Sequence, residues 1–111
     1  CKGKKIILIQ PLKKILMSNF QTKIIKHYQK KGRTVLNIIR LSANGYPDLY
    51  TFKKNELDIW IESKDEKDRL SELQKLRIDE LNKTGKIAFC LQKGKGIIYG
   101  NMEFKKEFES W

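Results

Sequence analysis

Apolar residues recur every four positions between Pro11 and Lys31, which is the spacing of one face of an α-helix. This stripe consists of Leu12, Leu16, Phe20, Ile24 and Tyr28, with Ile15 and Ile25 beside it. Pro11 suits the first turn of a single helix, whereas Ser18 or Asn19 could cap a helix that restarts there. In either case we expect Gly32 to end the helix.

Stretches rich in β-branched residues predict strands on both sides of this helix. The segment KKIILIQ (4–10) is typical of a short strand, and RTVLNIIRLS (33–42) of a longer one. DLYTF (48–52) and LDIWIES (57–63) flank the polar turn KKNE, and together they predict an antiparallel hairpin.

The segment LSELQKLRIDELNKTG (70–85) carries the start and stop signals of a second helix. Ser71 can cap its beginning, Gln74 can complete a capping box, and Gly85 can cap its end. KIAFCLQ (86–92) then predicts a buried strand.

The last residues predict a glycine turn (93–96), a short strand (97–100) and a short helix (103–111). The apolar stripe of that helix consists of Phe104, Phe108 and Trp111. It is expected to pack on its own domain, with a dimer contact as the alternative. No repeat or linker is visible, so we expect one domain over residues 1–111. Its fold class is α/β, in the order α-β-β-β-α-β, with a mixed central sheet flanked by helices and additions at both ends.

The composition is that of a globular protein, with 40% hydrophobic and 33% charged residues in 111. The longest apolar run, residues 6–9, is too short for a membrane span or a signal peptide, so we expect an intracellular protein. Cys1 and Cys90 lie far apart, and His27 is the one histidine, which argues against a Cys/His zinc site.

Positive charge is concentrated at one end of the sequence. Residues 1–47 contain eleven Lys or Arg and no acid, whereas residues 48–111 contain thirteen of each, so the net charge of +11 arises from the first part. A one-sided positive field favours binding of a polyanion, and nucleic acid is the expected partner. The candidate DNA-binding residues are Lys23, Lys26, Lys30, Lys31, Arg33, Arg40, Lys93 and Lys95.

Two carboxylates and an amine can converge in the predicted hairpin. Glu62 and Lys64 lie two apart on one strand, so their side chains leave the same face. If Phe52 pairs with Asp58, Asp48 falls opposite Glu62, with Cβ atoms about 5 Å apart. Two carboxylates so close repel each other unless a cation such as Mg²⁺ lies between them.

Phosphodiester hydrolysis uses such an arrangement. A divalent ion neutralises phosphate charge and activates water, and a nearby lysine stabilises charge that develops on the phosphate. A backbone carbonyl between Glu62 and Lys64 could supply a further oxygen ligand. The spacing alone is a loose pattern, because chance produces it often in lysine-rich chains.

The order of three motifs makes the pattern more specific. GYPDLY, then IWIESK, then LSELQKLRIDELNKTGKIAFCLQ resembles the VRR-NUC domain of the PD-(D/E)xK nuclease superfamily, from about Asn19 to Gln92. Residues 1–18 and 93–111 would be terminal additions. The resemblance implies a restriction-endonuclease-like core related to Holliday junction resolvases. It further implies a metal-dependent DNA nuclease, often acting on branched or flap DNA, whose stand-alone versions tend to form homodimers.

The resemblance also assigns roles to individual residues. Asp48 and Glu62 would bind Mg²⁺, or Mn²⁺ in its place, through their carboxylates, and Ser63 through its backbone carbonyl. Lys64 would be the catalytic lysine, and Gln74 would lie beside the site.

One position departs from the family pattern. Gln21 stands where the family commonly has a glutamate in its first helix, and no acid in residues 1–47 can replace it. Glutamine can hold a metal-bound water but brings no charge, which puts a second metal, or full activity, in question.

The main hypothesis is therefore a phage or bacterial endonuclease that cuts branched DNA. Two alternatives remain. The missing carboxylate could mark a nuclease fold kept for DNA binding only. A chain that starts at Cys1 could also be one nuclease module of a larger DNA-processing protein.

Overall fold

The computed structural model describes residues 8–9, 19–40 and 44–111, and at Leu8, Ile9, Ile39 and Arg40 the backbone alone. The elements follow in the order β1 (Leu8–Ile9), α1 (Asn19–Lys30), β2 (Thr34–Arg40), β3 (Leu49–Phe52), β4 (Ile59–Lys64), α2 (Glu72–Lys83), β5 (Ile87–Gln92) and β6 (Gly96–Gly100). The parts of the first predicted strand and helix that fall on residues 4–7 and 10–18 lie outside the described residues.

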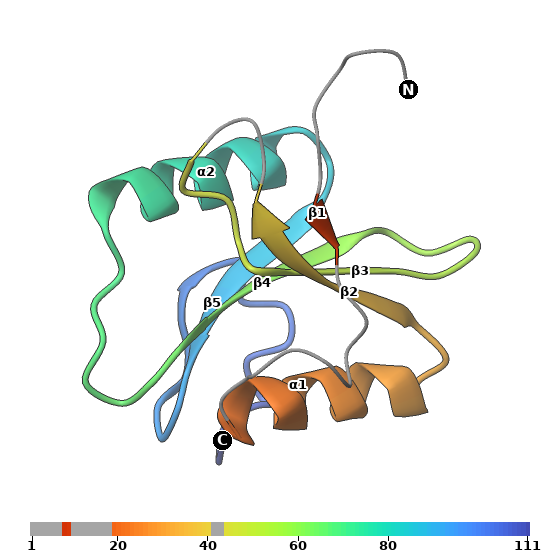
Figure 1. Ribbon diagram of the computed structural model, residues 1–111, viewed down its shortest axis with the longest axis horizontal. Coiled ribbons are helices and arrows are strands. Elements are labelled where there is room, and N and C mark those ends of the chain that lie inside the picture. Colours follow the sequence, from red (N-terminus) through yellow and green to blue (C-terminus); the bar gives the residue numbers. More distant parts are fainter. Residues whose placement is uncertain (1–7, 10–18, 41–43) are drawn as a thin grey trace.

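The strands form one sheet in the spatial order β1 to β6. Strands β4 and β5 are parallel, joined through α2, and every other neighbouring pair is antiparallel. The two helices lie on opposite sides of the sheet (Figure 1). The prediction of an α/β fold with a mixed sheet flanked by helices is confirmed.

The apolar stripe of α1 forms the centre of the larger core. Phe20, Ile24, Ile25 and Tyr28 are buried, and they belong to one cluster with apolar residues from β2 to β6. Full burial of each such side chain stabilises the fold by about 1.5–3 kcal/mol relative to exposure. Gly32 ends the helix with a positive φ of 80°.

On the other face of the sheet, α2 starts and ends where its sequence signals predict. Ser71 is the N-cap, and Gln74 completes a capping box with it. Ile78 and Leu81 pack on Ala88 and Cys90 of β5, so this smaller core fixes α2 against the strand that runs parallel to β4.

The predicted helix at 103–111 is wrong, because this segment consists of successive turns. Hydrogen bonds such as Glu107 N to Phe104 O and Trp111 N to Phe108 O span three residues. A segment this short has little helical stability of its own, so packing decides its conformation. Phe108 is fully buried in the core on the α1 side, with Phe104 and Trp111 packed against that core, so the stripe serves its own domain as expected.

Candidate active site

The hairpin has the register that brings the candidate residues together. Leu49 pairs with Ile61, and Thr51 with Ile59. The same register, continued by one residue, sets Asp48 opposite Glu62, as the sequence predicts.

The backbone that leads to Asp48 is fixed from two sides. Asp48 O accepts a hydrogen bond of 2.8 Å from Ile38 N of β2. On the other side, Gly45 adopts a positive φ of 86° and lies against Leu73 of α2, where a Cβ atom would come within 2.6 Å of Leu73 Cγ. Glycine is therefore required at the point where the chain turns into the site.

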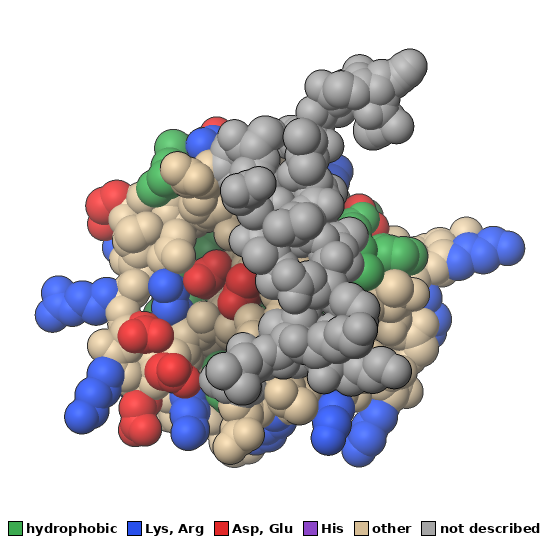
Figure 2. All heavy atoms as spheres, viewed as in Figure 1, with side chains coloured by type: hydrophobic (Ala, Val, Ile, Leu, Met, Phe, Trp, Pro, Cys, Tyr) green, Lys and Arg blue, Asp and Glu red, His purple; other side chains and the backbone are tan. Residues whose placement is uncertain are grey.

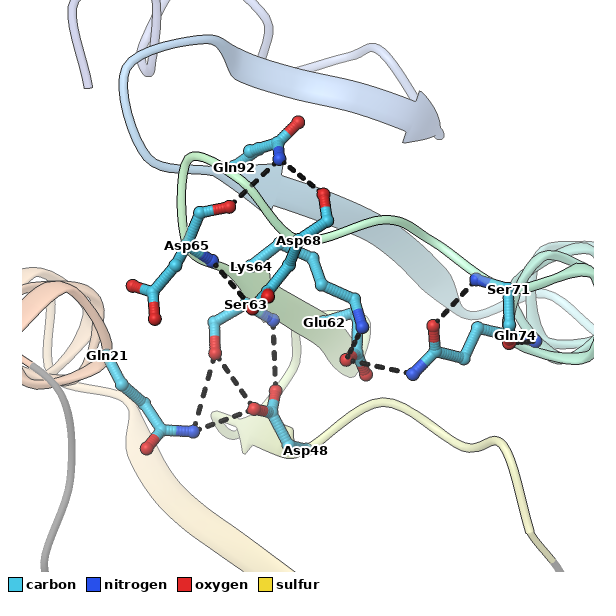
Figure 3. A network of polar contacts seen from close by, with 10 residues as sticks. All are labelled: Gln21, Asp48, Glu62, Ser63, Lys64, Asp65, Asp68, Ser71, Gln74 and Gln92. Carbon is cyan, nitrogen blue, oxygen red and sulfur yellow. Dashed lines mark hydrogen bonds and ion pairs between the residues drawn. The ribbon is translucent and has the colours of Figure 1, made fainter.

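The Asp48 carboxylate accepts hydrogen bonds from three donors. Ser63 donates through its backbone N at 3.1 Å and through its Oγ at 2.8 Å, and Gln21 donates through Nε2 at 2.7 Å. Burial raises the pKa of Asp48, and the hydrogen bonds from Ser63 oppose that shift. Figure 3 shows Gln21 reaching this carboxylate from α1.

The Glu62 carboxylate is buried, with 6% of the residue exposed. Its Oε2 lies 3.5 Å from Lys64 Nζ and accepts a hydrogen bond of 3.2 Å from Gln74 Nε2. Burial, followed by the nearby charge of Asp48, raises the pKa of Glu62 to about 8, and Lys64 opposes the shift. One ammonium group therefore does not balance two carboxylates.

Gln74 has both roles that its position in the sequence allows. Its Oε1 accepts a hydrogen bond of 2.9 Å from Ser71 N in the capping box, while its Nε2 donates to Glu62. Because the N–H of Ser71 requires the amide oxygen, the capping box turns the amide nitrogen toward the site (Figure 3).

The sequence analysis missed two polar contacts in this region. The first is the Ser63 hydroxyl, which bonds to Asp48 and lies 3.4 Å from Gln21 Nε2, whereas the motif pointed to the carbonyl. Strand alternation gives no signal for this contact, because it places Ser63 on the face opposite Glu62, whereas Asp48 was expected on the face of Glu62.

The second is Gln92, a buried residue paired with Lys64 across the parallel strands. Its Nε2 donates to Asp65 O at 2.9 Å and to Asp68 O at 2.8 Å, which holds the loop that follows Lys64. No local signal in the sequence indicates this contact.

The basic residues do not form one surface. Lys23, Lys26 and Lys30 are exposed on α1, and Lys93 and Lys95 are exposed in the β5–β6 turn. Lys31 Nζ lies 3.2 Å from Glu107 Oε2. In the space-filling view, acidic side chains gather between the two helices, and Lys and Arg side chains project around the rim (Figure 2).

Arg33, another candidate DNA-binding residue, is buried and is not exposed to DNA. It donates from Nε to Thr51 Oγ1 at 2.8 Å, from Nη1 to Glu56 at 2.8 Å and from Nη2 to Leu57 O at 2.7 Å. It therefore ties β2 to the hairpin. The side chain of Arg40 lies outside the described part of the chain.

The donor atoms of the site fit a hard divalent cation. Asp48 and Glu62 offer carboxylate oxygens, which Mg²⁺ and Mn²⁺ prefer, and their raised pKa values indicate a place where positive charge is favourable. No group of three or more His, Cys, Asp or Glu side chains converges among the described residues. Further ligands would thus be backbone carbonyls and water, as is common for Mg²⁺.

Comparisons with known proteins identify the family and the fold. The family model of the VRR-NUC domain matches residues 10–93. Among solved structures, the chain is similar to Hjc, a Holliday junction resolvase from Archaeoglobus fulgidus, with a TM-score of 0.52 and 18% identity. That match covers 67% of this chain and 65% of the archaeal one. No curated protein matches.

None of the helices in the described residues is long and apolar enough to cross a membrane.

Proposed function

The chain belongs to the VRR-NUC domain family, and we propose that it is a divalent-metal-dependent endonuclease that hydrolyses phosphodiester bonds in branched DNA. The observation that carries the proposal is the convergence of Asp48, Glu62 and Lys64 at one end of the hairpin. The match to a protein named as a Holliday junction resolvase supports a junction as the substrate. The setting we propose is the interior of a bacterium or a phage-infected cell.

Asp48, Glu62 and the backbone carbonyl of Ser63 would hold Mg²⁺, or Mn²⁺ in its place. A bound divalent ion supplies charge neutralisation at the phosphate and lowers the pKa of a coordinated water. Ser63 and Gln21 fix the orientation of Asp48 through the hydrogen bonds that they donate. Gln74 does the same for Glu62 from the other side.

Lys64 is the proposed catalytic lysine. Its ammonium is held beside Glu62, and Gln92 fixes the loop that directly follows it. From this position it stabilises negative charge on the phosphate or orients the attacking water. A water held by Gln21 could complete the site, but the neutral amide adds no charge, so we propose one metal ion rather than two.

The exposed lysines of α1 and of the β5–β6 turn would hold the DNA backbone. Each chain carries one site, and resolution of a junction requires cuts in two strands, so we propose a homodimer as the active form. The mass of the protein in solution, measured with and without a junction, tests whether it forms a dimer.

The decisive experiment is cleavage of a labelled four-way junction, a flap and a plain duplex in Mg²⁺, Mn²⁺ or EDTA. We expect metal-dependent cutting of the branched substrates, lost in Lys64→Ala. Lys83→Ala is the matched control, since Lys83 is an exposed lysine at the end of α2. Equal activity of Lys64→Ala and the wild type would contradict the assignment.

A second candidate function is DNA binding without nuclease activity. It is favoured by Gln21, because a neutral residue in place of the family's glutamate leaves the site with two carboxylates. Tight binding of junctions that EDTA does not change, with no cutting in either metal, would support this alternative. Recovery of cutting in Gln21→Glu would then identify the missing charge as the cause.

A further inference from the structure

The outer face of α1 carries a cavity that the nuclease chemistry does not use. Its volume is about 510 Å³, and its lining includes Thr22, Lys23, Lys26, His27, Lys30 and Trp111. Cavities of about 300–1,000 Å³ are the usual size of small-ligand sites in proteins. Trp111 comes from the other end of the chain, so the cavity forms where the terminal turns pack on the helix.

Trp111 forms a fixed aromatic wall. Its ring centroid lies 4.9 Å from those of His27 and Phe108, nearly perpendicular to both. Its backbone is held by hydrogen bonds, from Gly94 N to Trp111 O at 2.7 Å and from Trp111 N to Phe108 O at 3.1 Å. The indole is therefore positioned before any ligand arrives, which reduces the entropy lost on binding.

The charged groups of the cavity are cationic. Lys23, Lys26 and Lys30 line it, and Lys23 Nζ lies 4.3 Å from the centroid of the Trp111 ring. The acidic neighbour is Glu107, which does not line the cavity and contacts His27 and Lys31. Because this ammonium lies over the indole, a base that stacks on the ring would displace it, and the ammonium would then be available to a phosphate.

We propose that this cavity binds an unpaired nucleotide of a DNA strand, with its phosphate on the lysines and its base against Trp111. Aromatic platforms beside a basic groove are how proteins hold single strands, because every base has a π-face. A duplex keeps its bases stacked inside and would contact the lysines alone.

The place of the cavity on α1 links it to the candidate active site, and in this respect the inference rests on the proposed function. Gln21 reaches Asp48 from one side of the helix, while Thr22 and Lys23, which follow it, line the cavity. The cavity thus lies less than one turn along α1 from the residue that reaches the site, on another side of the helix, and an unpaired strand leaving the site would pass around α1 to reach it. Selectivity for DNA with an unpaired arm would follow from this contact.

The test measures binding of the full chain to a short oligothymidylate and to a short duplex, in EDTA so that no strand is cut. We expect Trp111→Ala to weaken oligothymidylate binding by about fivefold to a hundredfold, the range that loss of one base stack produces, and to leave duplex binding unchanged. Lys23→Ala should weaken binding of both the oligothymidylate and the duplex. Lys83→Ala should leave the ratio of the two affinities unchanged. Equal losses for both ligands in Trp111→Ala, or no loss for either, would overturn the proposal.

Fluorescence gives a second readout that leaves Trp111 in place. Trp60 Nε1 has no hydrogen-bond partner among the described residues, so Trp60→Phe breaks no hydrogen bond there and leaves Trp111 as the remaining tryptophan. Oligothymidylate should quench its emission, and duplex should not. Quenching by neither ligand would contradict the base stack. Because both measurements exclude metal, they separate a failure of this site from a failure of the nuclease chemistry.

Discussion

Glu62 keeps a carboxylate where burial and a second carboxylate both oppose its charge. A structural role would be served as well by glutamine, which has the same shape and no charge to desolvate. The charged residue therefore makes sense as a ligand whose partner is a cation. A buried carboxylate whose charge lowers stability is typical of a functional site.

The buried carboxylate of Glu62 predicts how stability depends on pH. The pKa of Glu62 is raised from 4.5 in a free side chain to about 8 in the folded protein. The folded state thus binds its proton more tightly than the unfolded chain does. The protonated Glu62 therefore stabilises the folded state. This stabilisation is complete below pH 4.5 and is lost as the pH rises through 8. We expect the Tm of the metal-free protein to fall over this range, and Asp48, whose pKa is also raised, acts in the same direction.

Thermal melts between about pH 5 and about pH 8, in EDTA or in Mg²⁺, measure this dependence. Glu62→Gln should flatten the decline and raise the Tm at the alkaline end. Mg²⁺ should stabilise the wild type more at high pH than at low pH, because the ligands must be deprotonated to bind it. The matched control is Glu72→Gln, whose carboxylate is 91% exposed and should not alter the slope. A wild-type Tm that rises toward pH 8 in EDTA would contradict the assignment.

At the scale of elements, the start of α2 connects helix capping with the site. Gln74 uses its oxygen for the cap and its nitrogen for Glu62. Gln74→Glu keeps an oxygen for Ser71 N but replaces the donor with a negative charge. Since glutamate serves a capping box as well as glutamine does, the cap should persist. The negative charge added beside Glu62 should lower the stability of the metal-free protein and reduce cleavage by about tenfold or more.

Ser71→Ala should lower stability but leave cleavage unchanged. It removes the hydroxyl that accepts from Gln74 N, at a cost of about 1 kcal/mol in unfolding free energy, and leaves the donor to Glu62 in place. Urea denaturation and initial cleavage rates, measured on both variants, separate the two roles. Wild-type cleavage rates in Gln74→Glu would mean that the cap alone explains this glutamine.

The same elements show what the sequence can predict. The hairpin register was predicted only for the case that Phe52 pairs with Asp58, and the structure has that register. Alternation excludes a slip of one residue, which would have turned Leu49 and Ile61 away from the core. The start of α2 followed from local capping rules. Both signals are contained in short stretches of chain.

Contacts between distant segments could not be predicted in this way. Nothing near Arg33 in the sequence indicates that its guanidinium bonds to Thr51 and Leu57. The turns at 103–111 follow from packing of Phe108 on α1, which overrides a helical pattern too short to be stable alone. Gln92 and the Ser63 hydroxyl were missed for the same reason, since their partners lie on other elements.

At the scale of the whole molecule, α1 and the candidate site carry opposite charges. All thirteen acids lie in residues 48–111, whereas Lys23, Lys26 and Lys30 are exposed on α1, which lies on the opposite side of the sheet from α2. These lysines are one basic group of the protein, separate from the carboxylates at the end of the hairpin. In the proposed function, α1 would hold the DNA while one phosphate reaches Asp48 and Glu62.

This arrangement predicts that Lys26 and Arg33 contribute in different ways, although both are basic residues of the same region. Lys26 is exposed on α1, so Lys26→Ala should weaken DNA binding and reduce the slope of log K against log salt by about 0.9, the value for one phosphate contact on duplex DNA. Stability should not change. Arg33→Ala leaves the oxygens of Thr51 and Leu57 without their donor, so we expect a loss of about 1–3 kcal/mol in unfolding free energy and an unchanged salt slope.

Binding titrations across a range of salt concentrations, paired with urea denaturation, distinguish the two variants. Lys83→Ala, on the far side of the sheet, controls for the general effect of one lost charge. If Arg33→Ala changed the salt slope as much as Lys26→Ala does, Arg33 would have to reach DNA, and its buried bonds would have to break when DNA binds. If neither changed it, the outer face of α1 would not be the DNA surface, and the basic half of the sequence would need another position relative to the duplex.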